Sequence, residues 1–269
     1  MSLQDLHTHT TYCDGKDSPE DMIKAAIEMG LDTIGFSGHI YMAHGESYCM
    51  AKDDIQKYIA EINELKEKYS GKIKVLCGIE ADLYAKEDIS GFDYVIGSVH
   101  DIKCGDEFLP IDHTADIYRR GVEKYFGGDM YAASEEYFAS VAECIKKTNA
   151  DIIGHFDLIT KFNEKENLFD ETHPRYVAAY KKAIDELIPL GKPFEINTGA
   201  MSRGYRTSPY PSADILAYIA QKGGKVILTG DTHAKENLCY EFGKALDAAK
   251  KAGFETICNA EDIIKEPSH

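Results

Sequence analysis

Seven short apolar runs alternate with longer amphipathic segments along this chain, and that alternation restricts the folds open to it. Each run is rich in Ile, Val or Phe, which is typical of parallel strands buried beneath helices. The expected strands are residues 3–7, 33–37, 73–80, 94–100, 152–155, 194–197 and 226–229. Seven strand–helix units in series predict a parallel α/β sheet, either rolled into a barrel or open and doubly wound.

The segments between these runs carry helix start and stop signals. Ser18 and Pro19 provide an N-cap and a first-turn proline for a helix expected over 19–29, which Gly30 ends. The pattern over 115–148 is interrupted by two glycines, so two helices are expected there. Further helices are expected over 53–69, 174–190, 212–222 and 235–252.

The totals describe an ordinary globular chain with an acidic surface. The 269 residues contain no low-complexity tract or linker, so we expect a single domain over residues 1–269. No apolar run reaches the ~20 residues that span a bilayer, the N-terminus does not resemble a signal peptide, and seven cysteines form no C-x-x-C pair. These features predict a cytoplasmic protein with reduced thiols and no membrane partner. The net charge of −16 argues against nucleic acid as a partner.

Histidines and carboxylates recur where the expected strands end. His7 and His9 close the first strand, and residues at i and i+2 of an extended segment project to the same side, so both imidazoles reach one ion. The other candidate ligands are Asp14, His39, Glu80, His100, His155, Asp231 and His233. Because these groups are spread over the whole series of strands, and a barrel gathers all strand ends at one face, the distribution favours a TIM-barrel-like fold.

The residue types at these positions predict a metal centre. A lone His-x-His pair is more often surface or core decoration, but six of the ten histidines fall at strand ends, which chance explains poorly. Imidazole and carboxylate without thiolate suit Zn, Mn, Fe or Ni. Nine ligands are too many for one ion, and Glu80 is the candidate for a bridging carboxylate. We expect His44, His113, His173 and His269 to be ordinary exposed residues.

These motifs resemble the PHP (polymerase and histidinol phosphatase) family. The resemblance covers essentially the whole chain and rests on His7-x-His9, Asp14, Gly38-His39, Glu80, His100, His155 and Asp231-x-His233. Segments 97–100, 125–129, 154–159 and 195–198 are similar to the histidinol-phosphate phosphatase branch in particular. One departure follows Asn197, where this chain reads Thr-Gly-Ala-Met-Ser-Arg and the branch more usually reads Thr-Ala-Gly-Leu-Arg.

The resemblance implies a distorted (β/α)7 barrel with a trinuclear centre of divalent Zn, Mn or Fe. In the implied arrangement, the first metal is held by His7, His9, Glu80 and Asp231. The second is held by Glu80, His100 and His155, and the third by Asp14, His39 and His233. The implied substrate is L-histidinol phosphate, which histidine biosynthesis converts to L-histidinol and phosphate.

Hydrolysis of a phosphate ester needs charge neutralisation and an activated water, and metal ions supply both. We expect a hydroxide that bridges the first two metals to attack phosphorus in line with the leaving alkoxide. Arg203 or Arg206 is a candidate for a bidentate phosphate contact. Asp157 is a candidate for the general acid, or for a group that orients a histidine, and Ser98 and Lys161 are expected near the mouth of the site.

Three other functions remain open from the sequence. One is a phosphoesterase of the same fold that acts on a small nucleotide or another phosphate ester. A metal-binding barrel that serves as an interaction module is a second, and the complete ligand set counts against it. The third is metal-dependent amide or lactone hydrolysis, in which a neutral substrate has no use for Arg203 and Arg206.

Overall fold

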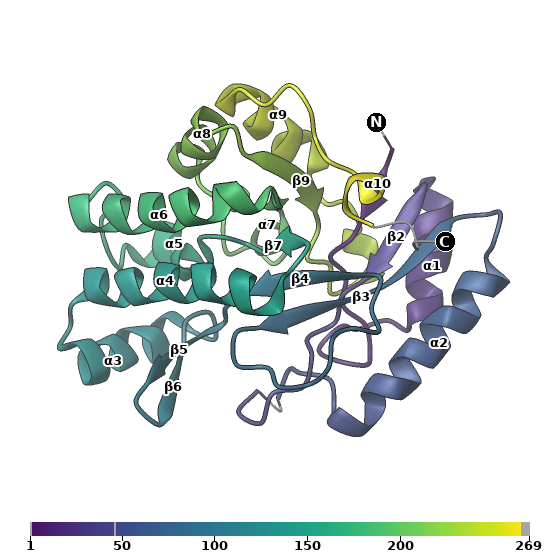
Figure 1. Cartoon of the computed structure of the whole chain (residues 1–269), viewed down its shortest axis with the longest axis horizontal. Helices are drawn as coiled ribbons and strands as arrows, with labels where there is room; N and C mark the ends of the chain where they lie inside the picture. The colour runs from purple at the N-terminus through teal and green to yellow at the C-terminus, as the bar shows by residue number, and fades with distance from the viewer. Residues whose placement is uncertain (1, 46, 265–269) are drawn as a thin grey trace.

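Seven parallel strands form the centre of the protein in a computed structural model that describes residues 2–45 and 47–264. They are β1 Gln4–Asp5, β2 Thr33–Phe36, β3 Lys74–Asp82, β4 Tyr94–Ser98, β7 Ile152–Ile153, β8 Pro193–Asn197 and β9 Lys225–Thr229. Neighbours in the order β1-β2-β3-β4-β7-β8-β9 all pair in parallel. The sheet curls into a nearly closed barrel (Figure 1), so the expected α/β barrel is confirmed.

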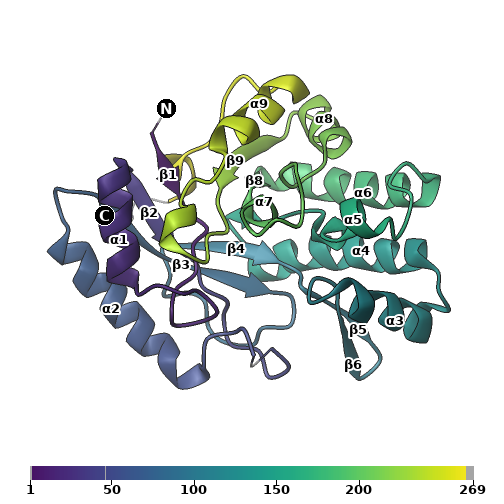
Figure 2. The same cartoon turned by 180° about the vertical axis from the view of Figure 1, so that it is seen from behind.

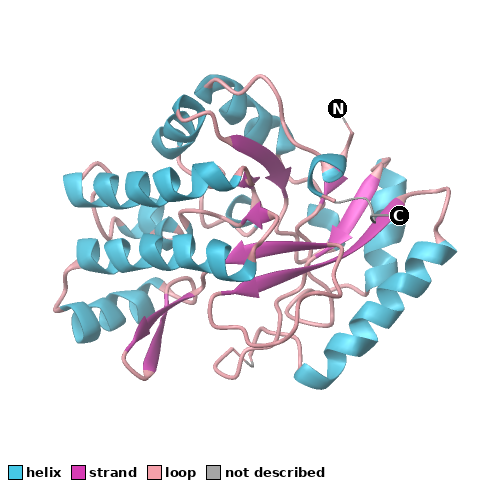
Figure 3. Ribbon diagram, in the orientation of Figure 1, coloured by secondary structure: helices cyan, strands magenta, loops and turns pink. Residues whose placement is uncertain are grey.

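Helices follow the strands and pack around the barrel (Figures 2 and 3). They are α1 Pro19–Met29, α2 Ile55–Lys68, α3 Ala115–Phe126, α4 Met130–Thr148, α5 Asn163–Glu166, α6 Pro174–Leu187, α7 Gly199–Ser202, α8 Ala213–Gln221, α9 Phe242–Ala252 and α10 Ala260–Ile263. Ser18 caps α1 as expected, and the expected break between α3 and α4 is confirmed. Among the described helices, none combines the length and apolar character that a membrane span requires.

The helix expected over 235–252 is wrong in its first part, because α9 begins only at Phe242. Residues Lys235–Asn237 form a short 3-10 turn instead. Cys239 and Glu241 then adopt left-handed backbone conformations, with φ of 51° and 53°, which interrupt any helix. The amide of Cys239 donates to the buried carboxylate of Asp5 at 3.3 Å, so a contact with the first strand competes with local helix formation.

A hairpin that the sequence pattern does not indicate lies between β4 and α3. Strand β5 (Asp101–Cys104) pairs in antiparallel fashion with β6 (Glu107–Pro110) across a turn at Gly105, whose φ is 68°. The two strands form their own small sheet beside the barrel (Figure 3). The hairpin therefore follows His100 directly and adds a wall at the end of the barrel where the strands finish.

The first and last strands close the barrel through the residues that follow them. Thr8 and Thr232 form a parallel bridge, in which the amide of His9 donates to the carbonyl of Thr232 at 2.8 Å. The buried carboxylate of Asp5 accepts hydrogen bonds from the Gly230 amide at 2.9 Å and from the Thr232 hydroxyl at 3.0 Å. These contacts hold the segments after β1 and β9 side by side.

Alternation along the strands separates two apolar clusters. Cys77, Ile79 and Ala81 of β3 belong to the large cluster that packs against the helices. Leu76 of the same strand belongs to a smaller cluster with Leu6, Tyr94, Ile96, Ile152, Ile227, Ala260 and Ile263. Because successive side chains of a strand point to opposite faces, this smaller cluster forms the apolar core inside the barrel. Glu80 has the same parity as Leu76 and therefore also points inward.

Tyr94 fills the barrel because two glycines leave room for its ring. Its hydroxyl donates to the carbonyl of Leu6 at 2.5 Å. A Cβ atom added at Gly78 would lie 2.3 Å from the Tyr94 ring, and one added at Gly35 would lie 2.4 Å from its hydroxyl. The two glycines are thus required by a close approach.

We expect Gly78→Ala to lower the free energy of unfolding by about 1–3 kcal/mol, since the buried Tyr94 ring has to shift against a packed core. Gly243→Ala is the matched control, because Gly243 lies in α9 with no atom within 4 Å of an added Cβ. That change should raise stability by about 0.5–1 kcal/mol. Urea unfolding followed by circular dichroism measures both. Equal stability of Gly78→Ala and the wild type would contradict the packing described for Tyr94.

Candidate metal centre

All nine candidate ligands lie together at the end of the barrel where the strands finish. Seven of them are buried, whereas His233 is half-buried and Asp14 is exposed. Glu80 lies near the end of β3, and the other ligands lie in the segments that follow β1, β2, β4, β7 and β9. The nine residues are His7, His9, Asp14, His39, Glu80, His100, His155, Asp231 and His233. Residues that are 226 positions apart in the sequence thus meet at one face.

Glu80 lies among five imidazoles. Its Oε2 atom is 2.8 Å from His39 Nδ1, 3.3 Å from His7 Nε2 and 3.7 Å from His9 Nε2. Its Oε1 atom is 3.0 Å from His155 Nε2 and 3.5 Å from His100 Nε2. Burial raises the pKa of this carboxyl group, but His39 and His7 outweigh that effect and hold the pKa well below its usual range. The carboxylate is therefore charged, and each of its two oxygens faces imidazole nitrogens.

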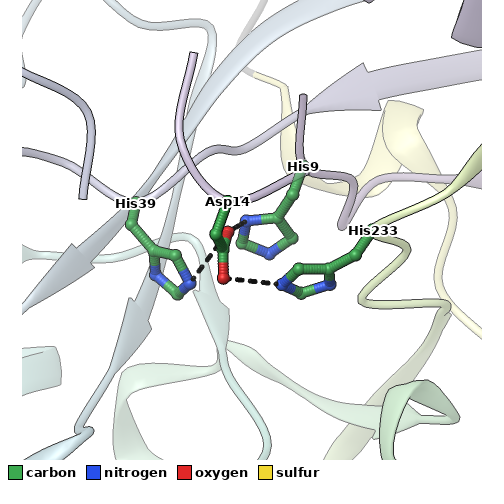
Figure 4. Close-up of side chains that lie close together, drawn as sticks. All are labelled: His9, Asp14, His39 and His233. Carbon is green, nitrogen blue, oxygen red and sulfur yellow. Dashed lines mark hydrogen bonds and ion pairs between the residues drawn. The ribbon is translucent and has the colours of Figure 1, made fainter. Parts of the chain in front are cut away.

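Asp14 and Asp231 extend the same cluster. Figure 4 shows Asp14 between three imidazoles, 3.2 Å from His233 Nε2, 3.5 Å from His9 Nδ1 and 3.8 Å from His39 Nε2. Asp231 Oδ1 lies 3.2 Å from His9 Nε2. The backbone of Asp231 is left-handed, with φ of 47°, which is uncommon for a residue other than glycine and is typical of functional sites.

The polar atoms of this cluster fit bound metal ions. His7 Nε2, His9 Nε2 and Glu80 Oε2 are buried and have no hydrogen-bond partner within the described part of the chain. An unpaired buried polar atom is costly, and a cation satisfies all three. The donor atoms form three groups, and within each group all the atoms lie within 4.8 Å of one another. The groups are His7–His9–Glu80, His39–Glu80–His100 and His9–Asp14–His39–His233. Imidazole and carboxylate donors of this kind suit divalent transition metals.

Two buried carboxylates that the sequence reasoning missed orient the histidines. Glu195 Oε1 lies 2.7 Å from His7 Nδ1, and its Oε2 accepts a hydrogen bond from the His155 amide at 2.8 Å. Asp82 Oδ2 lies 3.4 Å from His100 Nδ1 and accepts from the amide of that residue at 2.9 Å. Such partners fix the orientation of a metal-binding imidazole. The alternation of side chains along β8 and β3 could have indicated both carboxylates, since it places Glu195 and Asp82 on the inner face of their strands.

Arg203 and Lys161 reach the cavity above the cluster. The Arg203 guanidinium donates to Asp231 Oδ2 at 3.0 Å and lies 2.8 Å from His233 Nδ1. Lys161 Nζ donates to Asp112 Oδ2 at 3.0 Å and lies 4.9 Å from the centre of the Tyr205 ring. Both cations are therefore held in place by neighbours, next to the candidate ligands.

Arg206, Asp157 and Ser98 are not among the described residues that line this cavity. Arg206 donates to the Thr160 hydroxyl and lies over the Tyr210 ring at 4.6 Å. Asp157 is fully buried and accepts a hydrogen bond from the Ser212 amide at 2.9 Å, and burial raises its pKa to about 6. The Ser98 hydroxyl is buried where β4 passes Gly154. The structure thus separates these three residues from Arg203 and Lys161.

The cavity has a volume of about 430 Å³ and includes groups of both charges. Besides Arg203 and Lys161, it is lined by Asp101 and Asp112, which the sequence reasoning did not single out. His44 and His113 also line it, and both are exposed, as expected. His173 instead caps α6 and stacks on Tyr131 at 3.7 Å. His269 lies outside the described residues.

A model of the PHP domain matches residues 5–199 of the chain. The chain belongs to the PHP domain family. The histidinol-phosphatase of Lactococcus lactis subsp. lactis is 28% identical over 96% of this chain and 94% of its own length. A probable histidinol-phosphatase of Schizosaccharomyces pombe is 24% identical over 90% of this chain and 83% of its own length.

Two solved structures share the PHP barrel. A crystal structure of the putative histidinol phosphatase of Listeria monocytogenes superimposes with a TM-score of 0.75 at 19% identity, over 89% of this chain and 98% of that one. A crystal structure of histidinol phosphate phosphatase from Lactococcus lactis, complexed with zinc, L-histidinol and phosphate, gives a TM-score of 0.72 at 24% identity, over 95% of each chain. The distorted barrel is therefore the fold of this PHP protein.

We expect Glu195→Gln to weaken zinc binding about 10- to 100-fold, because the amide no longer supplies a charged partner to His7. Competition with a chromophoric chelator measures the affinity without any assay of activity. Glu186→Gln is the control, since Glu186 is exposed on α6 and pairs with Lys146. Zinc affinity in Glu195→Gln that equals the wild-type value would remove the orienting role assigned to Glu195.

Proposed function

We propose that this PHP protein is a histidinol-phosphatase, which hydrolyses L-histidinol phosphate to L-histidinol and phosphate in histidine biosynthesis. The observation that carries the proposal is a cluster of metal-binding side chains that opens into a cavity with two fixed cations, Arg203 and Lys161. Four curated relatives that match most of the chain at 24–28% identity are histidinol-phosphatases or probable ones. We further propose that residues 1–269 form one domain and that the enzyme is cytoplasmic.

The proposed cofactors are three divalent ions, with Zn, Mn and Fe as the candidates. The first would be held by His7, His9, Glu80 and Asp231, the second by Glu80, His100 and His155, and the third by Asp14, His39 and His233. The donor sets described above support this grouping, with His9 close to the third site and His39 close to the second. When bound, such ions neutralise phosphate oxygens and lower the pKa of a coordinated water.

Arg203 and Lys161 are proposed to bind the phosphoryl oxygens. Each already has an acidic partner, Asp231 for the guanidinium and Asp112 for the ammonium group. These partners hold the two cations in position before the substrate arrives, so little side-chain entropy is lost on binding. Arg203 has the planar fork that suits two phosphate oxygens, whereas Lys161 acts as a point charge.

Asp101 is proposed to bind the ammonium group of histidinol phosphate. Of the four carboxylates among the described lining residues, Asp14 and Asp231 belong to the ligand cluster and Asp112 pairs with Lys161. Asp101 is buried, accepts a hydrogen bond from the Tyr48 hydroxyl at 3.3 Å and lies 3.4 Å from His44 Nε2. It has no lysine or arginine partner among the described residues, so it is available to a cationic substrate group.

A turnover screen of the metal-loaded enzyme tests the proposed function. We expect kcat/KM for L-histidinol phosphate to exceed the values for sugar phosphates, small nucleotides and an aryl phosphodiester by at least 100-fold, and chelation to abolish it. Arg203→Ala should lower kcat/KM about 10- to 100-fold, which corresponds to the loss of one charge-assisted hydrogen bond to the phosphoryl group. A nucleotide preferred over histidinol phosphate would instead favour the related phosphoesterase acting on small nucleotides.

Asp101→Asn should reduce the preference for an ammonium-bearing substrate about 10-fold. The measurement is the ratio of kcat/KM for L-histidinol phosphate to that for 4-nitrophenyl phosphate, which has no ammonium group. Asp116→Asn is the control, because Asp116 is exposed on α3. A ratio that is the same in Asp101→Asn, Asp116→Asn and the wild type would exclude Asp101 as the ammonium contact.

A further inference from the structure

A second cavity adjoins the metal-ligand cavity and shares His44 with it. It has a volume of about 740 Å³, within the range of small-molecule sites. Four lysines line it: Lys52, Lys86, Lys103 and Lys147. Glu87 is the one carboxylate among the described lining residues, although acids outnumber bases by 46 to 30 in the whole chain. A lysine cluster on an acidic protein marks a place that attracts anions.

Only one of these four lysines pairs with a carboxylate among the described residues. Lys52 Nζ lies 2.9 Å from Glu87 Oε1, which balances one pair of charges. Lys147 Nζ donates to the carbonyl of Leu83 at 2.5 Å, so its ammonium group is positioned by a neutral partner. Lys86 and Lys103 have no carboxylate within 4 Å among the described residues. The cavity therefore retains three unbalanced positive charges from its described lining.

Aromatic rings form another part of the cavity wall. His44 and Phe108 stack with ring centres 3.7 Å apart and planes within 1°. Tyr84 meets the Phe108 ring edge-on at 5.0 Å, and Tyr41 also lines the cavity. Planar apolar surface of this kind binds planar rings by stacking, with little preference for one ring over another. The wall thus offers a second type of contact that a simple anion does not use.

We propose that this cavity binds a nucleoside phosphate, with the base against the Tyr84 and Phe108 rings and the phosphates among Lys86, Lys103 and Lys147. A neutral aromatic compound would leave three ammonium groups without partners. An inorganic polyphosphate would leave the aromatic wall in water. A nucleotide matches both halves of the cavity, and this site is separate from the one at which we propose that phosphate esters are hydrolysed.

Isothermal titration of the metal-loaded protein with ADP tests the site, with adenosine and pyrophosphate as matched probes. We expect ADP to bind at least 10-fold more tightly than either, because only ADP uses both halves of the cavity. Lys86→Ala/Lys103→Ala should weaken ADP binding at least 10-fold, and Phe108→Leu should bring ADP closer to pyrophosphate. Lys72→Ala/Lys250→Ala is the control, since both of those lysines are exposed on other parts of the surface.

Arg203→Ala distinguishes this cavity from the metal-ligand cavity, because Arg203 lines only the latter. We expect that variant to bind ADP as the wild type does. Loss of ADP binding in Arg203→Ala alone, equal affinity for pyrophosphate and ADP, or unchanged binding in Lys86→Ala/Lys103→Ala would each overturn the proposal. Thermal unfolding checks that the double variant is folded, and the single changes Lys86→Gln and Lys103→Gln replace it if it is not. None of these results depends on whether histidinol phosphate is hydrolysed.

Discussion

Glu80 carries one buried negative charge among imidazoles that arrive from four different parts of the barrel. A carboxylate that is 2% exposed is costly unless its neighbours compensate it. The compensating nitrogens belong to residues that follow β1, β2, β4 and β7, so they meet Glu80 only when those strands lie in register around β3. The ligand cluster and the barrel therefore depend on each other. The bridge between Thr8 and Thr232 completes this arrangement, because it brings the segment with Asp231 and His233 beside the segment with His7 and His9.

The inner face of β3 shows how one strand serves both stability and chemistry. Leu76 packs in the apolar core inside the barrel, Gly78 leaves space for the Tyr94 ring, and Glu80 belongs to the ligand cluster. The barrel is thus apolar at one end and polar at the other, with the change occurring within four residues. Glu195 and Asp82 follow the same rule on the inner faces of β8 and β3. Their carboxylates hold histidines in place from within the barrel wall, where water does not compete for the hydrogen bonds.

The sequence was sufficient for features with a local signal. The seven strands, the Ser18 cap and the break between α3 and α4 each follow from a short pattern, and the positions of the candidate ligands follow from strand ends. Features that depend on tertiary contacts could not be predicted from the sequence. Arg203 and Arg206 are three residues apart and chemically alike, yet one lines the cavity and the other faces Thr160 and Tyr210. Cys239 leaves the helical pattern because Asp5, more than 230 residues earlier, accepts its amide hydrogen.

The two cavities use charge in different ways, and this difference follows from how their lysines and arginines are paired. In the metal-ligand cavity, the charged lining residues other than the candidate ligands are two cations, Arg203 and Lys161, and two carboxylates, Asp101 and Asp112, so their charges balance. Attraction of phosphate there must come largely from whatever cations the ligand cluster holds. Asp101 has no lysine or arginine partner among the described residues, which is why we propose that it receives the positive end of the substrate. In the neighbouring cavity, no carboxylate of the described residues pairs with Lys86 or Lys103, so the anion binding that we propose there would depend on the polypeptide itself and not on the metal ions.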